Sequence, residues 1–276
     1  MPRFKFFYLV PLLLLLFACS EYQKVLKSPN PEYKYTKAVE YYEEGEYVKA
    51  LPLLEELVPL FRGTEKGQKI YYYYCYTNYY LDYHLTAAFH FRRFYETYPV
   101  SENAEDALFM SAYCNYLDSP KPSLDQSPTY RALKELQLFV NTFPQSKLVD
   151  STNTLVDDLL RKLEVKAFEN AKQYYKLRQY KAAIVALNNV LTDYPGTEYE
   201  EEIRLKILQS YFYLAANSIE SKKEERFDKG IESYYDFIDK FAEGKNSDAA
   251  EQIFKNMVKA KEELERQNLV PTHNEL

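Results

Sequence analysis

The chain has 276 residues, of which 46% are apolar and 28% are charged, so it can bury a core and is not wholly disordered. Six glycines and no tryptophan stand beside 29 tyrosines and 17 phenylalanines, a composition that favours helices over folds rich in positive-φ turns. The sequence contains no glycine-rich phosphate-binding motif, and its formal charge of −6 opposes non-specific binding of nucleic acid. We therefore expect no nucleic-acid partner.

Residues 1–18 have the pattern of an export signal. Arg3 and Lys5 form a charged start, and the apolar run behind them is too short to span a bilayer as a helix. The sequence Leu-Phe-Ala-Cys that ends at Cys19 resembles the lipobox of bacterial lipoproteins, where a lipid is attached to the cysteine. The resemblance implies a lipid anchor on Cys19, a tether over 19–31 and no other cofactor. An ordinary secretory signal with an incidental cysteine is the alternative.

A repeated pattern of small and aromatic residues follows. The arrangement Ala-x-x-Tyr and then Tyr-x-x-Ala at 38–50 recurs 133 residues later at 171–183. Ala87, Ala132 and Ala183 are each followed twelve residues later by a proline that comes directly after an aromatic residue. Alanine suits a close contact between two helices, and proline ends a helix. The repeat is therefore a pair of antiparallel helices, which resembles the tetratricopeptide repeat. A serine or threonine two residues after each proline is expected to accept hydrogen bonds from amides at the next helix start.

Five such helix pairs and a closing helix account for most of the chain. The predicted pairs are 32–62, 66–99, 103–144, 150–195 and 199–242, followed by a capping helix at 247–266 and a polar tail at 267–276. The third and fifth pairs carry insertions, a proline-rich loop at 118–128 and a charged stretch at 219–226. The predicted fold class is all-α, a right-handed α-solenoid of about five tetratricopeptide-like helix pairs with a polar C-terminal cap. An irregular all-α globule is the alternative.

The tyrosines suggest where a ligand binds. In a tetratricopeptide-like stack the first helix of each pair lines a concave surface, so the resemblance implies a peptide-binding groove on those helices. The predicted groove residues are Tyr35, Tyr42, Tyr72, Tyr76, Tyr79 and Tyr80. The segment 70–81 is apolar or aromatic nearly all round, and such a helix needs two covered faces. Tyrosine combines apolar area with a hydroxyl at its edge, which suits extended peptides. Simple packing between helices is the alternative for each ring.

No arrangement in the sequence points to catalysis or to metal binding. His84 and His90 are six residues apart and do not share a helix face, and His273 lies in the polar tail. Acidic residues are dispersed among lysines, and no nucleophile-elbow motif occurs. Cys75 and Cys114 fit no zinc pattern, and both a disulfide and burial as free thiols remain open. We expect no enzyme activity, no catalytic residue and no metal site.

The lipobox, the short tether and the aromatic-Pro-x-Ser/Thr joints at 98–101 and 143–146 together resemble the BamD family of outer-membrane assembly lipoproteins. The segment 125–129 before the helix with Ala132 is a further point of similarity. The resemblance implies a non-enzymatic scaffold, lipid-anchored in the outer membrane and facing the periplasm. The implied partners are a BamA-like barrel protein, chiefly at the C-terminal pairs, other assembly-machinery lipoproteins, and unfolded outer-membrane protein substrates at the N-terminal pairs.

Two other functions and one question of orientation remain open. Ser20 and Glu21 follow the cysteine directly, and acidic residues at that place route some Bacteroidetes lipoproteins to the cell surface. One alternative is another tetratricopeptide envelope adaptor, which joins cell-wall or division machinery to the membrane. The other is a surface nutrient-binding lipoprotein similar to the SusD family, although the lack of tryptophan, a favoured sugar platform, argues against it.

Overall fold

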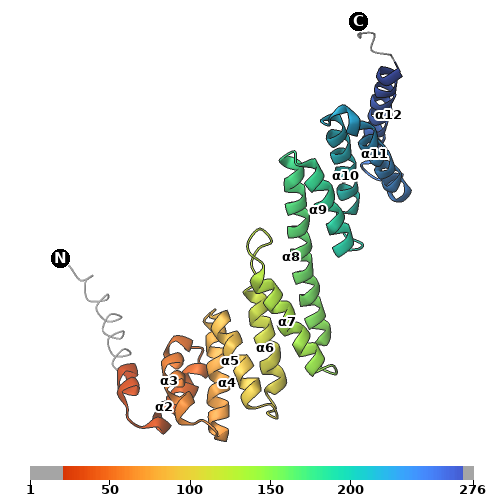
Figure 1. The fold of residues 1–276 in the computed structure, drawn as a ribbon. Helices are drawn as coiled ribbons and strands as arrows, with labels where there is room; N and C mark the ends of the chain where they lie inside the picture. The colour runs from red at the N-terminus through yellow and green to blue at the C-terminus, as the bar shows by residue number, and fades with distance from the viewer. Residues whose placement is uncertain (1–20, 270–276) are drawn as a thin grey trace, which may run out of the picture. The chain divides into compact units, whose positions relative to one another are not determined.

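The computed structural model describes residues 21–269, and every regular element in that range is a helix (Figure 1). The helices are α2 (Pro31–Glu43), α3 (Tyr47–Leu60), α4 (Glu65–Tyr80), α5 (His84–Thr97), α6 (Ala104–Leu117), α7 (Ser127–Thr142), α8 (Val149–Lys176), α9 (Tyr180–Asp193), α10 (Glu200–Ala216), α11 (Glu220–Phe241) and α12 (Ser247–Leu269). The predicted export signal, Cys19 and His273 lie outside the described residues. No helix within the described range is both long and apolar enough to cross a membrane.

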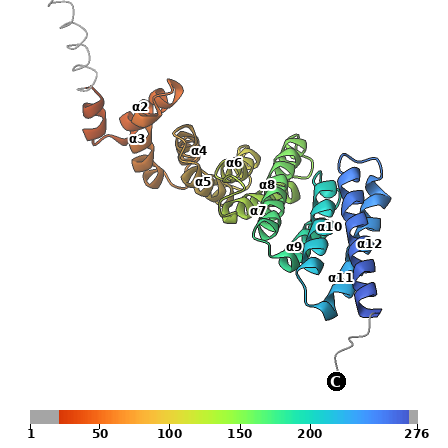
Figure 2. The ribbon, with the colours of Figure 1, turned by 90° about the horizontal axis from the view of Figure 1, so that it is seen from above.

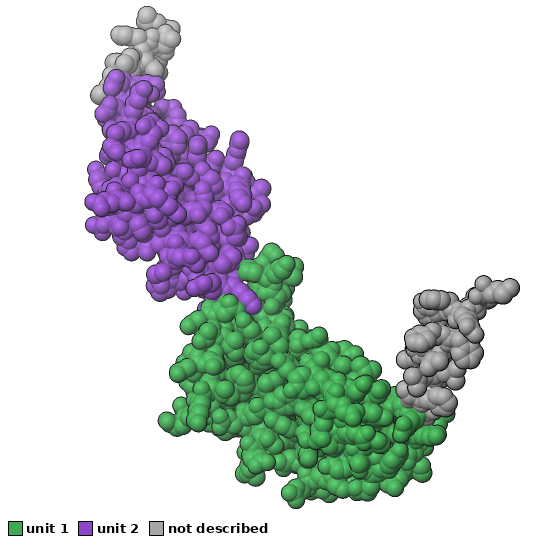
Figure 3. Space-filling view, turned by 180° about the vertical axis from the view of Figure 1, so that it is seen from behind, with its two compact units in different colours: residues 1–159 green, residues 160–276 purple. Residues whose placement is uncertain are grey.

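The helices form two compact units, unit 1 (Met1–Leu159) and unit 2 (Leu160–Leu276) (Figure 3). In unit 1, α2 packs on α3, α4 on α5 and α6 on α7, and each pair also contacts the next one. In unit 2, α10 packs on α9, α11 on α10 and α12 on α11, and these helices lie side by side in both ribbon views (Figure 2). The predicted all-helical stack of antiparallel pairs with a closing helix is confirmed.

The core of unit 1 lies where the two helices of each pair touch. Ala38 of α2 and Ala50 of α3 are fully buried against each other's helices, which approach closely because alanine adds so little volume. In α5, Ala87, Phe91 and Phe94 form one fully buried stripe at helical spacing. The spacing of small and aromatic residues therefore encodes which face of each helix is buried.

The segment expected to be a tether is partly folded. Residues 21–27 are helical, and Val25 is fully buried in the core of unit 1. The hydroxyl of Tyr22 donates a hydrogen bond to the carbonyl of Lys49, 3.3 Å away. The apolar side of this short helix packs on the first pair, so any free tether within the described residues is limited to a few positions.

The core of unit 2 also lies where neighbouring helices touch. Ala183 and Leu187 of α9 are fully buried and pack on Phe168 of α8. Farther along, Gly230 of α11 lies so close to α12 that a Cβ atom there would come within 2.6 Å of the sulfur of Met257. The lack of a side chain at Gly230 therefore leaves room for the end of the Met257 side chain between α11 and α12.

Three turns within pairs share one geometry. Gly45, Asp82 and Arg178 occupy the left-handed region with φ of +75°, +60° and +60°. In the first of these turns the next amide, that of Glu46, donates to the carbonyl of Tyr41 at 2.8 Å, and the other two turns repeat this bond. The pattern is that of a helix C-terminal cap, which satisfies carbonyls that the helix leaves unpaired.

The joints between pairs also repeat. The hydroxyls of Ser101, Ser146 and Thr197 each accept a hydrogen bond from the backbone amide two residues later, at 3.0–3.1 Å. These amides belong to Asn103, Leu148 and Tyr199, which directly precede the next helices, so the hydroxyls order the joint by a local turn and bond one residue before the helix amides that the sequence predicted. One short segment thus ends one helix pair and begins the next.

The two predicted insertions differ in structure. The segment between α6 and α7 is an ordered loop, in which the buried Gln126 donates from its amide to the carbonyls of Lys121 and Leu124. The charged stretch at 219–226 instead forms the first turns of α11. Glutamate and lysine are good helix formers, and Glu225 pairs along the helix with neighbouring lysines.

Candidate functional site

A layer of tyrosine rings covers one side of unit 1. We call it the tyrosine layer, and it consists of Tyr42, Tyr47, Tyr72, Tyr73, Tyr76, Tyr79, Tyr80 and Tyr113. Tyr42 of α2 stacks on Tyr73 of α4 with ring centroids 4.1 Å apart. Tyr47, at the start of α3, stacks on Tyr80 at 4.5 Å. The rings come from α2, α3, α4 and α6, so packing of successive pairs assembles the layer.

Five of the six predicted groove residues belong to this layer, and Tyr35 does not. The ring of Tyr35 lies instead against Phe61, 6.4 Å between centroids, with the ammonium of Lys66 4.9 Å from its centre. Sequence reasoning missed Tyr47, Tyr73 and Tyr113, which join the layer from the start of α3, the middle of α4 and α6.

The tyrosine layer both packs and remains accessible. Its members on α4 are half-buried by their neighbours, while Tyr80 remains 45% exposed. The opposite face of α4, with Ile70 and Cys75 fully buried, packs into the core. Helix α4 therefore has the two covered faces that its sequence requires, one in the core and one built from stacked rings.

Asp106 fixes the centre of the tyrosine layer. The hydroxyls of Tyr72 and Tyr76, one helical turn apart on α4, both donate to the same carboxylate oxygen of Asp106 at 2.7 and 2.6 Å. Hydrogen bonds to an ionised acceptor are short and strong. Burial and the Asp106 carboxylate raise the pKa of both hydroxyls, so they remain protonated donors at physiological pH. Sequence reasoning missed Asp106, which in the sequence is one of two acidic residues in the first turn of its helix.

The histidines form no common site. His84 lies 3.6 Å from the carboxylate of Asp82, whereas His90 contacts the hydroxyl of Tyr71 through Nδ1 at 3.2 Å. Burial and the nearby Arg93 lower the pKa of His90. Within residues 21–269, no group of three or more His, Cys, Asp or Glu side chains is arranged to hold a metal ion.

The two described cysteines are free and fully buried. Burial raises the pKa of Cys114 to about 12 and raises that of Cys75 as well. Only a thiolate is an effective nucleophile, so these thiols are unreactive in the folded chain and act as small apolar residues of the core.

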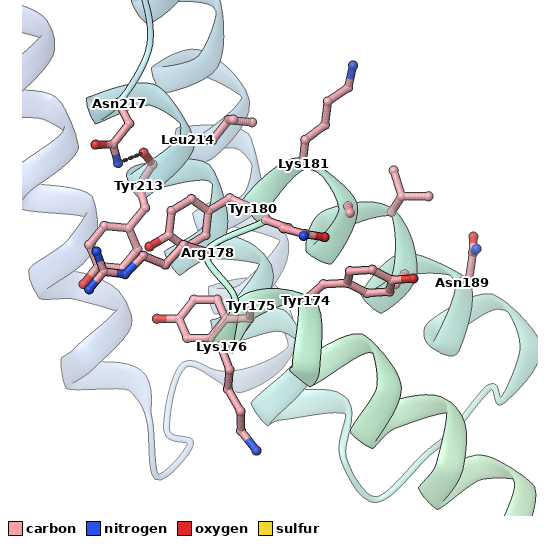
Figure 4. Close-up of a pocket in the computed structure, with 14 residues that line it drawn as sticks. Tyr174, Tyr175, Lys176, Arg178, Tyr180, Lys181, Asn189, Tyr213, Leu214 and Asn217 are labelled. Atoms are coloured by element: carbon pink, nitrogen blue, oxygen red, sulfur yellow. Dashed lines mark hydrogen bonds between the residues drawn. The ribbon is translucent and has the colours of Figure 1, made fainter.

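Unit 2 contains a large open pocket that the sequence did not predict (Figure 4). It has a volume of about 1450 Å³ and lies between the end of α8, the start of α9 and the end of α10. Tyr180 stacks on Tyr213 with centroids 5.2 Å apart, and Tyr175 meets Tyr180 edge-on at 5.9 Å. The ammonium of Lys206 lies 4.6 Å from the centre of the Tyr175 ring. We call this site the α8–α10 pocket.

The described fold and its tyrosine-rich surfaces define a helical-repeat protein of the tetratricopeptide type. The comparisons with known families agree with this class and narrow it. Residues 28–227 match the family YfiO, outer membrane lipoprotein, and the chain belongs to that family. The resemblance to the BamD family inferred from the sequence is thereby confirmed.

Two individual proteins are similar to the chain. Over 125 residues it is 24% identical to the outer membrane protein assembly factor BamD of Caulobacter vibrioides, a match that covers 45% of this chain. The chain spans only 41% of that relative's length. Among solved structures it is similar to the TPR domain of P58(IPK), with 12% identity and a TM-score of 0.39 over 92% of this chain and 68% of that one.

Proposed function

We propose that this protein is a non-enzymatic scaffold lipoprotein of the machinery that assembles outer-membrane β-barrels. It binds a BamA-like barrel protein and receives unfolded outer-membrane protein substrates. Membership of an outer membrane lipoprotein family supports the location, and the similarity to an outer membrane protein assembly factor supports the task. The observation that carries the proposal is the tyrosine layer of unit 1, because it offers a polypeptide a broad, partly open surface of rings.

The tyrosine layer suits an unfolded β-strand for physical reasons. Side chains on one face of an extended strand recur every second residue, so several of them contact neighbouring rings of the layer at once. The rings supply apolar area, and their hydroxyls supply hydrogen bonds at the edge. Asp106 already fixes Tyr72 and Tyr76, so binding a strand costs little side-chain entropy at these positions.

A lipid on Cys19 completes the proposed mechanism. It holds the scaffold at the periplasmic face of the outer membrane and so raises the effective concentration of bound substrate beside the barrel partner. The C-terminal helix pairs bind that partner, and the tyrosine layer binds the substrate. No covalent step is needed, and the buried, protonated thiols and the separate histidines supply no catalytic group.

Crosslinking of a denatured outer-membrane barrel protein to the full-length lipoprotein tests whether the tyrosine layer binds the substrate while the C-terminal helix pairs bind the barrel partner. The variant Tyr79→Ser/Tyr80→Ser removes two accessible rings without touching the Asp106 bonds. The control Leu85→Ser/Phe89→Ser removes two exposed apolar side chains of α5, which are 52% and 57% accessible.

We expect the tyrosine variant to lose most substrate crosslinking while the BamA-like protein still co-purifies with it. The control variant is expected to keep both. Equal loss of substrate and barrel partner, or the same loss in the control, contradicts the proposed function.

A further inference from the structure

The α8–α10 pocket repeats part of the tyrosine layer. Tyr175, Tyr180 and Tyr213 stand 133 residues after Tyr42, Tyr47 and Tyr80, and the two trios have the same geometry. The first two rings of each trio meet edge-on, at 5.7 Å in unit 1 and 5.9 Å in unit 2. The last two stack, at 4.5 and 5.2 Å. Unit 2 therefore carries a second copy of the ring arrangement that we propose to bind polypeptide in unit 1.

Each ring trio has a fourth side chain beside its first ring, and this side chain differs in charge between the two units. In unit 1, Tyr73 stacks on the first ring of the trio. Its counterpart 133 residues later is Lys206, whose ammonium faces the ring of Tyr175 at 4.6 Å. A ring has thus been replaced by a cation at the same place in the arrangement.

The segments that follow the first tyrosine also differ in charge. Residues 43–49 contain three glutamates and one lysine, a net charge of −2, whereas the corresponding residues 176–182 contain two lysines and one arginine, a net charge of +3. The cations Lys176, Arg178 and Lys181 are exposed and line the pocket, and none of them forms an ion pair with another described residue. No Asp or Glu lines the pocket.

We propose that the α8–α10 pocket is a second polypeptide-binding site, which takes an extended acidic segment of a partner protein. The ring trio contacts aromatic or aliphatic side chains, and the rim cations pair with Asp and Glu. The side-chain amides of Gln179 and Asn189 line the same hollow and offer hydrogen bonds to a peptide backbone.

The positions of the cations favour a segment with several carboxylates over one free chain end. In Figure 4, Lys176 and Lys181 point to opposite sides of the ring trio, and Arg178 lies beside Tyr213. Three cations spread in this way match acidic residues distributed along a strand. A lipid surface is a poorer match, because the site is a hollow lined by ring faces and amides.

Binding of two short fluorescein-labelled peptides to the full-length lipoprotein in detergent tests the inference. One peptide alternates phenylalanine with aspartate and the other alternates phenylalanine with lysine, and fluorescence anisotropy measures their affinities. The variant Lys176→Glu/Lys181→Glu inverts the rim and leaves Arg178 in place, because that residue has a positive φ. We expect it to bind the aspartate peptide on the order of tenfold more weakly and the lysine peptide more tightly.

Two further variants separate the pocket from total charge. Arg131→Glu/Lys134→Glu makes the same change in net charge on exposed α7 residues of unit 1, and we expect wild-type affinity for the aspartate peptide. Tyr213→Ser removes one ring of the trio, and we expect it to weaken that peptide while helix content by circular dichroism stays unchanged.

Three results overturn the inference: no binding of the aspartate peptide to the wild type, equal binding of both peptides, or equal effects of the pocket and α7 variants. Loss of binding to phosphatidylglycerol vesicles in Lys176→Glu/Lys181→Glu, with the aspartate peptide unaffected, overturns it in favour of a lipid site. The likeness to the tyrosine layer rests on the proposed function, but the two tests fail separately: substrate crosslinking reports on the tyrosine layer, and these peptide affinities report on the α8–α10 pocket.

Discussion

Replacing Asp106 by alanine tests whether the tyrosine layer is held rigid by its central carboxylate. The carboxylate accepts two hydroxyl hydrogen bonds at 2.6 and 2.7 Å. A hydrogen bond to an ionised group contributes about 1.5–3 kcal/mol, but both tyrosines are only half-buried, so water replaces part of each bond. We therefore expect Asp106→Ala to lower the free energy of unfolding by about 2–4 kcal/mol, which includes about 0.3–1 kcal/mol for an acidic residue in the first turn of a helix.

Urea unfolding of the full chain measures this effect. Far-ultraviolet circular dichroism follows helix content, and tyrosine fluorescence follows tertiary packing, because the chain has 29 tyrosines and no tryptophan. Asp150→Ala is the matched control, since Asp150 is an exposed acidic residue in the first turn of α8 and its loss should cost less than about 1 kcal/mol. The loss in Asp106→Ala should fall on the transition of unit 1 if the two units unfold separately.

A double-mutant cycle makes the test stricter. Tyr72→Phe/Tyr76→Phe removes both donors, and combining it with Asp106→Ala should cost about 1–2 kcal/mol less than the sum of the two separate changes. Strict additivity, or an Asp106→Ala loss no larger than that of Asp150→Ala, refutes the reasoning that Asp106 organises the layer.

Three further predictions concern stability and anchoring. Gly67→Ala places a Cβ atom 1.9 Å from the backbone carbonyl oxygen of Phe61 and should lower the free energy of unfolding by about 3 kcal/mol. An unchanged melting temperature would contradict the described conformation of the turn before α4. Folding raises the pKa of Tyr72 and Tyr76, so the stability they contribute is complete below about pH 10 and is lost as the pH rises above it. Unfolding measured across alkaline pH should show this fall, and Tyr72→Phe/Tyr76→Phe should make it shallower; an equal fall in that variant argues against it. Cys19→Ala should give a folded protein that leaves the detergent phase on phase separation, and persistent partitioning into detergent would contradict the lipid anchor.

The helix pairs were predictable because their contacts are local. Each pair touches through small residues whose spacing is visible in the chain, and the predicted contact alanines are all fully buried: Ala38, Ala50, Ala87, Ala132 and Ala183. The joints are local as well, because each hydroxyl bonds to an amide only two residues away. Spacings that recur along the chain were enough to predict these elements.

The chemistry of the surfaces was less predictable because it depends on register between helices. Asp106 lies 30 residues after Tyr76, and only the packing of α6 on its neighbours brings its carboxylate to that hydroxyl. The α8–α10 pocket takes Tyr213 from a third helix, α10, which also places the Lys206 ammonium against the Tyr175 ring. The recurrence at 38–50 and 171–183 does not contain that helix. Spacing within one helix cannot report such contacts.

Two further features of the structure, the conformation of two turns and the helical insertion in α11, were not predicted from the sequence. The turns at Asp82 and Arg178 adopt the left-handed conformation that glycine favours, although neither residue is glycine. Fit within the pair outweighs the cost of about 1–2 kcal/mol at each position. The charged insertion at 219–226 lengthens α11, since its glutamate and lysine residues favour a helix once one has begun.

Affinity purification of the full-length lipoprotein from native outer membranes, with mass spectrometry of the proteins that co-elute, tests the central claim most directly. Our account predicts that a BamA-like barrel protein is recovered together with unfolded outer-membrane barrel proteins. Recovery of cell-wall, division or nutrient-uptake proteins without the barrel protein would contradict it.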